Sequence, residues 1–223
     1  MVPRTNMTCA IAGRFNGDVL AAVCKELAAN LDQSGPESCG VAYCYGNRLE
    51  AVQAGRTHGG GLDLAILAEL KTDMATLSLN RSGVVQPWIR REQGRAWGFA
   101  CEGEIPEPDK LSIGDRLPSL YRPEEKLFLH LVSKLNPDDP VGSVEASLPF
   151  GLVQPRFYLI NSEMLVVGSG ALASGSDSGL WFGRAQLVRA ISPVRFSSIT
   201  GMQWERIQER SVVALTRVRR ALS

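Results

Sequence analysis

A cysteine near the start of the chain and a glycine turn in its middle are the residues whose types and spacing favour chemistry. Residues 96–101 are predicted to form a buried strand that ends in a tight turn at Glu102-Gly103. A strand ending in such a turn presents side chains and backbone N–H groups at the rim of a sheet, where binding and catalytic groups tend to lie. We expect this turn to face the short segment 8–13, which contains Cys9. Any functional site is therefore predicted where these two segments meet.

The cysteines and histidines do not favour a metal site. The chain has five cysteines and two histidines, and no Cys-x-x-Cys pair. Cys39 and Cys44 lie five positions apart on one predicted strand, so their side chains should point to opposite faces. Buried thiols are the simpler expectation for them. We predict neither a metal nor a cofactor.

The composition is that of an ordinary globular domain. The chain has 223 residues, of which 44% are hydrophobic and 21% are charged, enough for a substantial core. A net charge of +1 gives no reason to expect nucleic acid or an anionic membrane as partner. No apolar run approaches the roughly 20 residues that cross a bilayer, and the first residues lack the apolar core of a signal peptide. A cytoplasmic protein is expected, with no nucleic-acid or membrane partner.

Hydrophobic periodicity predicts strands with single helices between them. Apolar residues at helical spacing predict helices over 18–31, 62–70 and 124–135. Turn residues at Gly46-Asn47 and Asn161-Ser162 predict two hairpins. The expected strands cover 7–14, 39–45, 48–54, 74–79, 84–90, 96–101, 153–160, 164–167, 186–191 and 211–218. Since no repeat or composition break divides the chain, we expect one α+β domain in which helices cover paired sheets.

Three segments carry a family resemblance. Residues 9–15 are Cys-Ala-Ile-Ala-Gly-Arg-Phe, residues 35–43 are Gly-Pro-Glu-Ser-Cys-Gly-Val-Ala-Tyr, and residues 97–105 are Trp-Gly-Phe-Ala-Cys-Glu-Gly-Glu-Ile. In that order they resemble the class II glutamine amidotransferase domain, a member of the N-terminal-nucleophile (Ntn) hydrolases. The family's segments are Cys-Gly-Ile-x-Gly, Gly-Pro-Asp-Ser-x-Gly-x-Ala and x-x-Phe-Ala-His-Asn-Gly-Glu-Ile. The resemblance implies a four-layer α/β/β/α sandwich of Ntn-hydrolase type, and hydrolysis of L-glutamine to glutamate and ammonia.

The resemblance also implies roles for individual residues. Cys9 would be the nucleophile, and Gly103 would belong to the turn that stabilises the oxyanion. An N-terminal cysteine uses its own α-amine, with a pKa of about 7.7–8.0, as the base. Because eight residues precede Cys9, we expect residues 1–8 to be an N-terminal extension or propeptide and residues 9–223 to be the amidotransferase-like domain. A start at Met7 would instead expose Thr8 once the methionine is removed.

Several working positions depart from the family pattern. Cys101 and Glu102 replace the His and Asn of the oxyanion turn. Losing one oxyanion donor costs about 2.7–4 kcal/mol, and an ionised Glu102 would also repel the developing charge. A solvated turn residue, or an acidic group that adapts the pocket to a cationic ligand, is the preferred interpretation of Glu102 over a residue of the oxyanion site. Asn80 cannot neutralise a substrate carboxylate, which Arg81 would bind after a shift of one residue, and Glu124 falls near the acidic residue that would hold the α-ammonium.

These departures leave two hypotheses about function. The first is an amidotransferase-type enzyme whose glutaminase activity, released by processing before Cys9, is weakened or lost. The second is a non-catalytic binding or assembly subunit that retains the same fold, and fold alone does not decide between them. Under both, glutamine or a related small molecule is the expected ligand. A synthase or another protein is the expected partner, because nothing after Ile105 resembles an ammonia acceptor.

Overall fold

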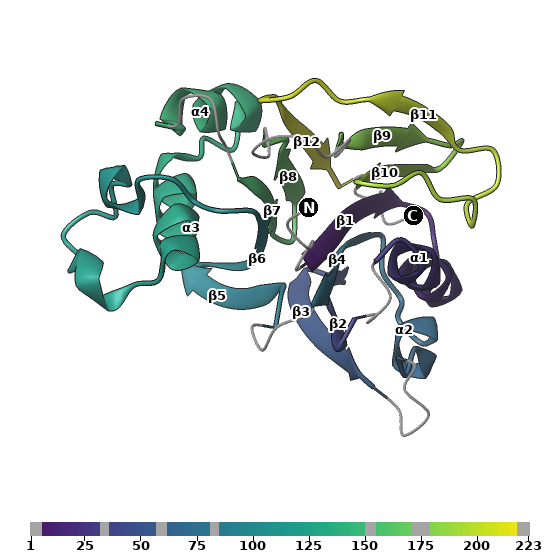
Figure 1. Cartoon of the computed structure of the whole chain (residues 1–223). Helices are drawn as coiled ribbons and strands as arrows, with labels where there is room; N and C mark the ends of the chain where they lie inside the picture. The colour runs from purple at the N-terminus through teal and green to yellow at the C-terminus, as the bar shows by residue number, and fades with distance from the viewer. Residues whose placement is uncertain are drawn as a thin grey trace.

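Two antiparallel sheets packed face to face form the centre of the molecule (Figure 1). The computed structural model describes residues 6–31, 36–56, 62–80, 85–149, 155–170 and 179–217. The first sheet has the strand order β11-β9-β10-β1-β4-β2-β3, and the second has the order β12-β8-β7-β6-β5. The strands are β1 (Asn6–Gly13), β2 (Ser38–Tyr45), β3 (Arg48–Gly55), β4 (Met74–Asn80), β5 (Trp88–Glu92), β6 (Arg95–Glu102), β7 (Arg156–Ile160), β8 (Met164–Gly168), β9 (Trp181–Arg184), β10 (Val188–Ser192), β11 (Gln203–Arg206) and β12 (Val212–Thr216).

Helices cover the outer face of each sheet. In Figure 1, α1 (Gly17–Ala29) and α2 (Ala65–Ala68) lie at the right beside the first sheet, whereas α3 (Pro123–Lys134) lies at the left beside the second. α4 (Pro140–Ser147) packs on α3 and β12, and two short 3₁₀ turns, η1 (Pro108–Lys110) and η2 (Pro118–Leu120), precede α3. The described residues therefore form four layers, helix, sheet, sheet and helix. None of the helices in the described ranges is long and apolar enough to cross a membrane.

Alternation along the strands decides which core each side chain enters. Side chains at i and i+2 of a strand share a face, so neighbours point to opposite sides of the sheet. In β1, Cys9 and Ile11 enter the core between the first sheet and α1, while Ala10 and Ala12 enter the core between the two sheets. In β6, Phe99 packs toward α3 and Ala100 toward the first sheet. The same alternation places Thr8 and Glu102 in the space between the sheets.

The predicted α+β fold with four layers is confirmed, and so are both hairpins. β2 pairs with β3 from Ser38↔Gly55 to Tyr45↔Arg48, and β7 pairs with β8 around the predicted turn at Asn161-Ser162. Cys39 and Cys44 enter different cores, as their spacing predicted. Strand pairing in β1 already begins at Asn6, within the segment predicted to be an extension.

Four elements differ from the sequence-based expectation. The strand predicted over 84–90 lies instead at Trp88–Glu92, at the edge of the second sheet. The strands β9 and β11 were missed because each has only four residues, too few for a visible alternation. The helix α4 was also missed: it buries only Val144, so its amphipathic signal is weak, although Asp139 caps it and Pro140 opens it.

Candidate functional site

A buried contact between Thr8 and Glu102 joins the two sheets. The backbone N–H of Thr8, in β1, donates a hydrogen bond of 2.5 Å to Oε1 of Glu102 at the end of β6. Thr8 has no exposed surface, and Glu102 is 9% exposed. The sequence therefore predicted correctly that the turn after β6 faces the start of the chain. The interpretation of Glu102 as a solvated turn residue is wrong, because its carboxylate lies between the sheets.

Arg156 is the cationic partner of Glu102. Its Nη1 lies 3.4 Å from Oε2 of Glu102, and the two residues are directly opposite each other in the β6–β7 pair. Arg156 is only 2% exposed, so this is a buried ion pair. Burial raises the pKa of the Glu102 carboxyl, although Arg156 and the hydrogen bonds from Thr8 act in the opposite direction. The folded protein therefore favours the protonated carboxyl more than water does.

Hydrogen bonds extend from Thr8 through the end of the first sheet. The hydroxyls of Thr8 and Ser78 lie 3.0 Å apart, and Ser78 Oγ donates to Oδ1 of Asn80 at 3.3 Å. Asn80 Nδ2 donates to the carbonyl oxygen of Gln86 at 2.9 Å, and the backbone N–H of Gln86 donates back to Asn80 Oδ1 at 3.3 Å. Asn80 is 2% exposed and thus serves to hold the 85–87 segment. In this arrangement it offers no free group to a substrate carboxylate.

The segment 85–87 also closes this end of the sheets. Gln86 Oε1 accepts a hydrogen bond of 2.8 Å from the backbone N–H of Cys101, which ties the segment to β6. A Cβ added to Gly40 of β2 would meet the carbonyl oxygen of Gln86 at 2.1 Å. Only a residue without a side chain allows this close approach. The backbone N–H of Cys101, next to the predicted oxyanion turn, is therefore already used within the protein.

Cys9 points away from this network. Its side chain is fully buried in the core that contains Cys24 of α1 and Cys39 of β2. Burial raises the pKa of the Cys9 thiol, and Cys24 and Glu102 raise it further. Since the thiolate is the nucleophile, this environment disfavours reactivity. The Cys9 backbone lies in the middle of β1, opposite Leu77 of β4.

Two other predicted site residues in the described ranges, Gly103 and Glu124, do not contribute a hydrogen bond or an ion pair to the Thr8–Glu102 contact. Gly103 is exposed and has φ of +88°, which suits a tight turn. Glu124 is half-buried in the first turn of α3. Along with burial, it raises the pKa of Cys101, whose side chain faces α3. No hydrogen bond or ion pair among the described residues joins Glu124 to Thr8, Glu102 or Arg156. Arg81 lies outside the described residues.

Sequence reasoning missed Thr8, Gln86 and Arg156 as members of this network. Arg156 falls inside the strand predicted over 153–160, where an arginine among apolar residues signals a buried charge that needs an acidic partner. Thr8 differs from Cys9 by one position, and a shift of one residue reverses the face of a strand. Two further polar atoms on this face, Tyr158 OH and Thr76 Oγ1, are buried without a hydrogen-bond partner among the described residues. The space between the sheets therefore contains polar atoms that the described residues leave without a hydrogen-bond partner.

Solved structures share this fold. The chain superimposes with a TM-score of 0.65 on the glutamine phosphoribosylpyrophosphate amidotransferase from B. subtilis complexed with ADP and GMP, at 14% identity, over 94% of this chain and 49% of that one. It matches a predicted glutamine amidotransferase from Pseudomonas aeruginosa with a TM-score of 0.59 at 13% identity, over 96% and 93% of the two chains. A glutamine aminotransferase class-II domain protein from Silicibacter pomeroyi gives 0.56 at 12% identity, over 94% of both chains.

These similarities concern the fold. The chain spans about half the length of the B. subtilis enzyme but nearly all of the other two proteins. No protein-family model matches the sequence, and no curated protein matches it. The chain therefore has the layered fold of class II glutamine amidotransferase domains, at identities of 12–14% that carry no activity with them.

Proposed function

We propose that this chain is an amidotransferase-like domain that does not hydrolyse glutamine while residues 6–8 remain attached, and that it acts as a non-catalytic binding or assembly subunit. One observation carries the proposal: the side chain on the face shared with Glu102 is Thr8, whereas Cys9 enters the core beside α1. A thiol that is buried on the helical side of the sheet cannot reach a substrate between the sheets.

Two further features support the loss of glutaminase chemistry. The Cys9 nitrogen is an amide within a paired strand, so it cannot accept a proton as a free α-amine does. Glu102 at the turn carries an acceptor, paired with Arg156, where an oxyanion requires donors. The nucleophile, its base and the group that stabilises the oxyanion thus all depart from what glutamine hydrolysis requires.

The experiment is a glutaminase assay on the full chain, together with intact-mass analysis. We expect a full-length mass and no glutamate release above background. The matched variants are Cys9→Ala and Cys24→Ala, since both thiols belong to the same buried core. Glutamate release that disappears in Cys9→Ala and persists in Cys24→Ala would overturn the proposal. A mass that begins at Cys9 would point to the same conclusion.

A second candidate function rests on the position of Thr8. If the chain were processed to begin at Thr8, its hydroxyl would lie 3.0 Å from Ser78 Oγ and its nitrogen 2.5 Å from Glu102, in the polar space between the sheets. A threonine with a free α-amine is an Ntn-type nucleophile. A version of the chain beginning at Thr8 tests this candidate. Amide hydrolysis lost in Thr8→Ala but retained in Cys9→Ala would favour it, and no hydrolysis would exclude it.

A partner protein belongs to the same proposal. An assembly subunit requires a second chain, and a synthase or another enzyme that consumes ammonia remains the predicted class. Co-purification of the full chain from the source cell tests this part of the proposal, and recovery of the chain without a second protein in stoichiometric amount would contradict it.

A further inference from the structure

A cleft lies at the end of β1 opposite to Thr8. Its volume is about 340 Å³, and it is lined by the end of β1, the β9–β10 turn and the end of β12. It therefore lies at one end of inner strands of the first sheet, beside the end of β12, which is an edge strand of the second sheet. The size falls within the range of small-molecule sites, which is about 300–1,000 Å³. None of the residues discussed at the Thr8–Glu102 contact belongs to it.

Two of its arginines are fixed on one face by strand register. Ala12 of β1 is opposite Arg189 of β10, and Arg189 is opposite Arg184 of β9. Because directly paired residues share a face, both arginines lie on the side of the first sheet that faces the second. Arg14 follows β1 and joins them in the lining. All three are exposed, and no acidic side chain among the described residues pairs with them.

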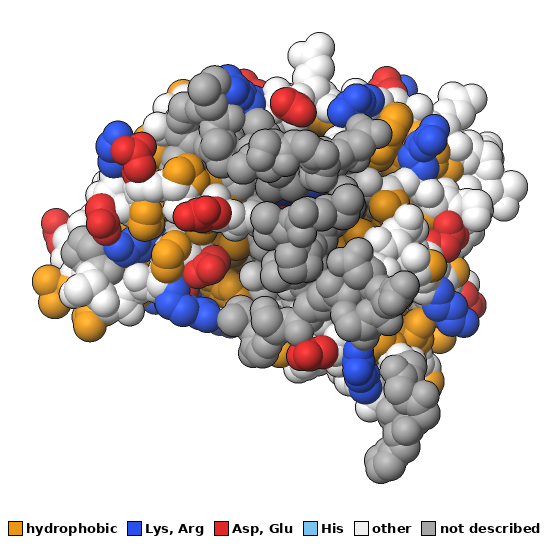
Figure 2. All heavy atoms as spheres, in the orientation of Figure 1, with side chains coloured by type: hydrophobic (Ala, Val, Ile, Leu, Met, Phe, Trp, Pro, Cys, Tyr) orange, Lys and Arg blue, Asp and Glu red, His pale blue; other side chains and the backbone are white. Residues whose placement is uncertain are grey.

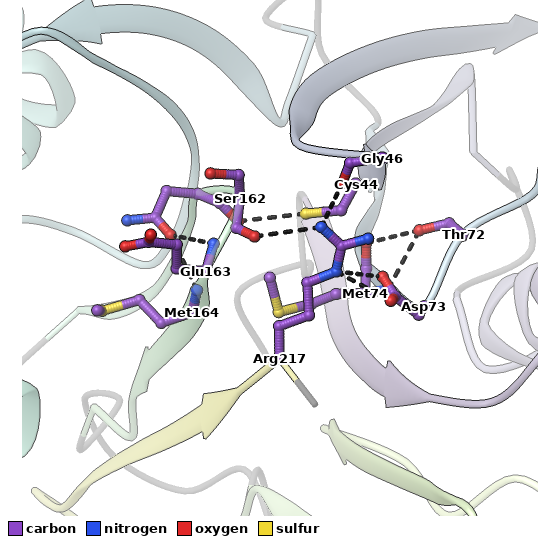
Figure 3. Close-up of polar contacts among 10 residues, drawn as sticks. Cys44, Gly46, Thr72, Asp73, Met74, Ser162, Glu163, Met164 and Arg217 are labelled. Atoms are coloured by element: carbon purple, nitrogen blue, oxygen red, sulfur yellow. Dashed lines mark hydrogen bonds and ion pairs between the residues drawn. The ribbon is translucent and has the colours of Figure 1, made fainter. Parts of the chain in front are cut away.

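The fourth arginine of the cleft is held in place by other groups. Arg217 Nε donates to both carboxylate oxygens of Asp73, at 2.7 and 2.9 Å, as Figure 3 shows. Its Nη1 donates to the carbonyl oxygens of Gly46 and Ser162, which belong to turns of the two different sheets. These contacts hold the Arg217 side chain in one position at the side of the cleft, and its positive charge is paired with Asp73. Four arginines and one aspartate give the lining a net charge of +3.

This concentration of positive charge is local. Over the described part of the face in Figure 2, basic and acidic side chains are interspersed. Like charges directly opposite each other in an antiparallel pair are destabilising, so Arg184 beside Arg189 costs folding free energy unless an anion lies between them. Guanidinium groups match phosphate oxygens with two parallel hydrogen bonds. Leu187 and Leu215 add an apolar wall for the remainder of a ligand.

We propose that this cleft binds a small molecule that carries a phosphate group, with Arg14, Arg184 and Arg189 contacting the phosphate. A carboxylate supplies a single negative charge, whereas a phosphate monoester carries about −1.5 to −2 at pH 7 and matches the surplus charge better. The site is independent of the proposed function, since it shares no residue with the Thr8–Glu102 contact.

The test is calorimetric titration of the full chain with inorganic pyrophosphate at constant ionic strength, with citrate as the carboxylate comparison. We expect saturable binding of pyrophosphate at one site and weaker binding of citrate, because each carboxylate of citrate brings a single charge to the arginines although its three carboxylates together carry several. Arg184→Gln and Arg189→Gln should each weaken pyrophosphate binding by about tenfold or more, since a hydrogen bond to a charged group is worth about 1.5–3 kcal/mol. Arg91→Gln, an exposed arginine on β5 in the other sheet, is the matched control and should bind as the parent does.

Three outcomes would overturn the proposal. Citrate binding as tightly as pyrophosphate would exclude a phosphate site. Equal weakening in Arg91→Gln would show a non-specific effect of charge, and unchanged binding in both cleft variants would place the anion elsewhere. Urea unfolding of each variant checks that the fold persists. Glutaminase activity does not enter the readout, so its presence or absence leaves the result unaffected.

Discussion

Charged side chains join the two sheets at both ends of β1, but the two ion pairs differ in their exposure to solvent. At the Thr8 end, Glu102 and Arg156 pair with almost no exposure to solvent. At the Gly13 end, Arg217 pairs with Asp73, whose side chain is 40% exposed. The first contact uses all its charge internally, whereas the second leaves three arginines beside it without acidic partners among the described residues.

This difference separates a structural role from a binding role. A buried ion pair must satisfy itself, because leaving one of its charges unpaired inside the protein costs several kcal/mol. The position that corresponds to a catalytic turn by resemblance has become such a pair. The open end, which the sequence did not single out, keeps surplus positive charge and a cleft. The turn that the resemblance links to catalysis and the cleft that holds arginines without acidic partners among the described residues therefore lie at opposite ends of β1.

The largest predicted effect is the loss of one partner at the buried end. Arg156→Met should destabilise the protein by about 3–5 kcal/mol, because the Glu102 carboxyl loses its cation and must be buried either as an unpaired charge or with a proton taken up at pH 7. Urea unfolding at pH 7 measures the change. The double variant Glu102→Gln, Arg156→Met should recover much of the loss, since no unpaired charge then remains. If the double variant is as unstable as the single one, packing rather than charge controls this site.

The pH dependence of stability sharpens the same comparison. Burial raises the pKa of Glu102 above its ordinary value of 4.5, so the folded state binds this proton more tightly than the unfolded chain does. The resulting contribution is fully present below pH 4.5 and is lost as the pH rises through the folded pKa. Above pH 4.5, and until the pH has passed the raised folded pKa, the stability of the parent relative to Glu102→Gln should fall with increasing pH. A constant difference across that range would contradict the raised pKa.

A smaller effect is expected from the segment that closes the buried end. Gly40→Ala would bring a methyl group to 2.1 Å from the Gln86 carbonyl oxygen, so the 85–87 segment must move, at a cost of about 1–3 kcal/mol. Gly55→Ala is the control. Gly55 lies at the end of β3, and an added Cβ has no heavy atom within 4 Å. Equal stability of the two variants in urea unfolding would show that this end is loosely packed.

The sequence predicted the buried end in outline but not in its contacts. Periodicity predicted β1, β4 and β6, and the tight turn that ends the 96–101 strand was expected to face residues 8–13. The motif drew attention to Cys9, but the residue of β1 that contacts Glu102 is Thr8, because the two side chains point to opposite faces of the strand. The two residues in contact are 94 positions apart, and local patterns do not determine how one sheet is placed on another.

The open end was hardly accessible from sequence. Arg184 and Arg189 are brought together by the pairing of β9 with β10, and β9 is too short to be recognised by alternation. Arg14 adjoins them only because β1 lies next to β10 in the sheet, although about 175 residues separate the two strands in the sequence. Strand order in an antiparallel sheet with crossovers is a property of the whole fold. Arginines that are brought together only by the order of strands in the sheet form no recognisable motif in the sequence.

The smallest predicted effect belongs to the partly exposed pair of Asp73 and Arg217. Asp73→Asn removes the carboxylate that Arg217 binds at 2.7 and 2.9 Å, but solvent already screens this contact. The expected loss of stability is therefore only about 0.2–1 kcal/mol, and it should shrink further in 1 M salt, where the Debye length is about 3 Å. Asp115→Asn, an exposed aspartate in the loop before α3, is the matched control and should leave stability unchanged. The loss in Arg156→Met should persist at high salt, because its cause is burial. If both losses respond equally to salt, the two ends do not differ in solvent access, and the distinction between a sealed end and an open end fails.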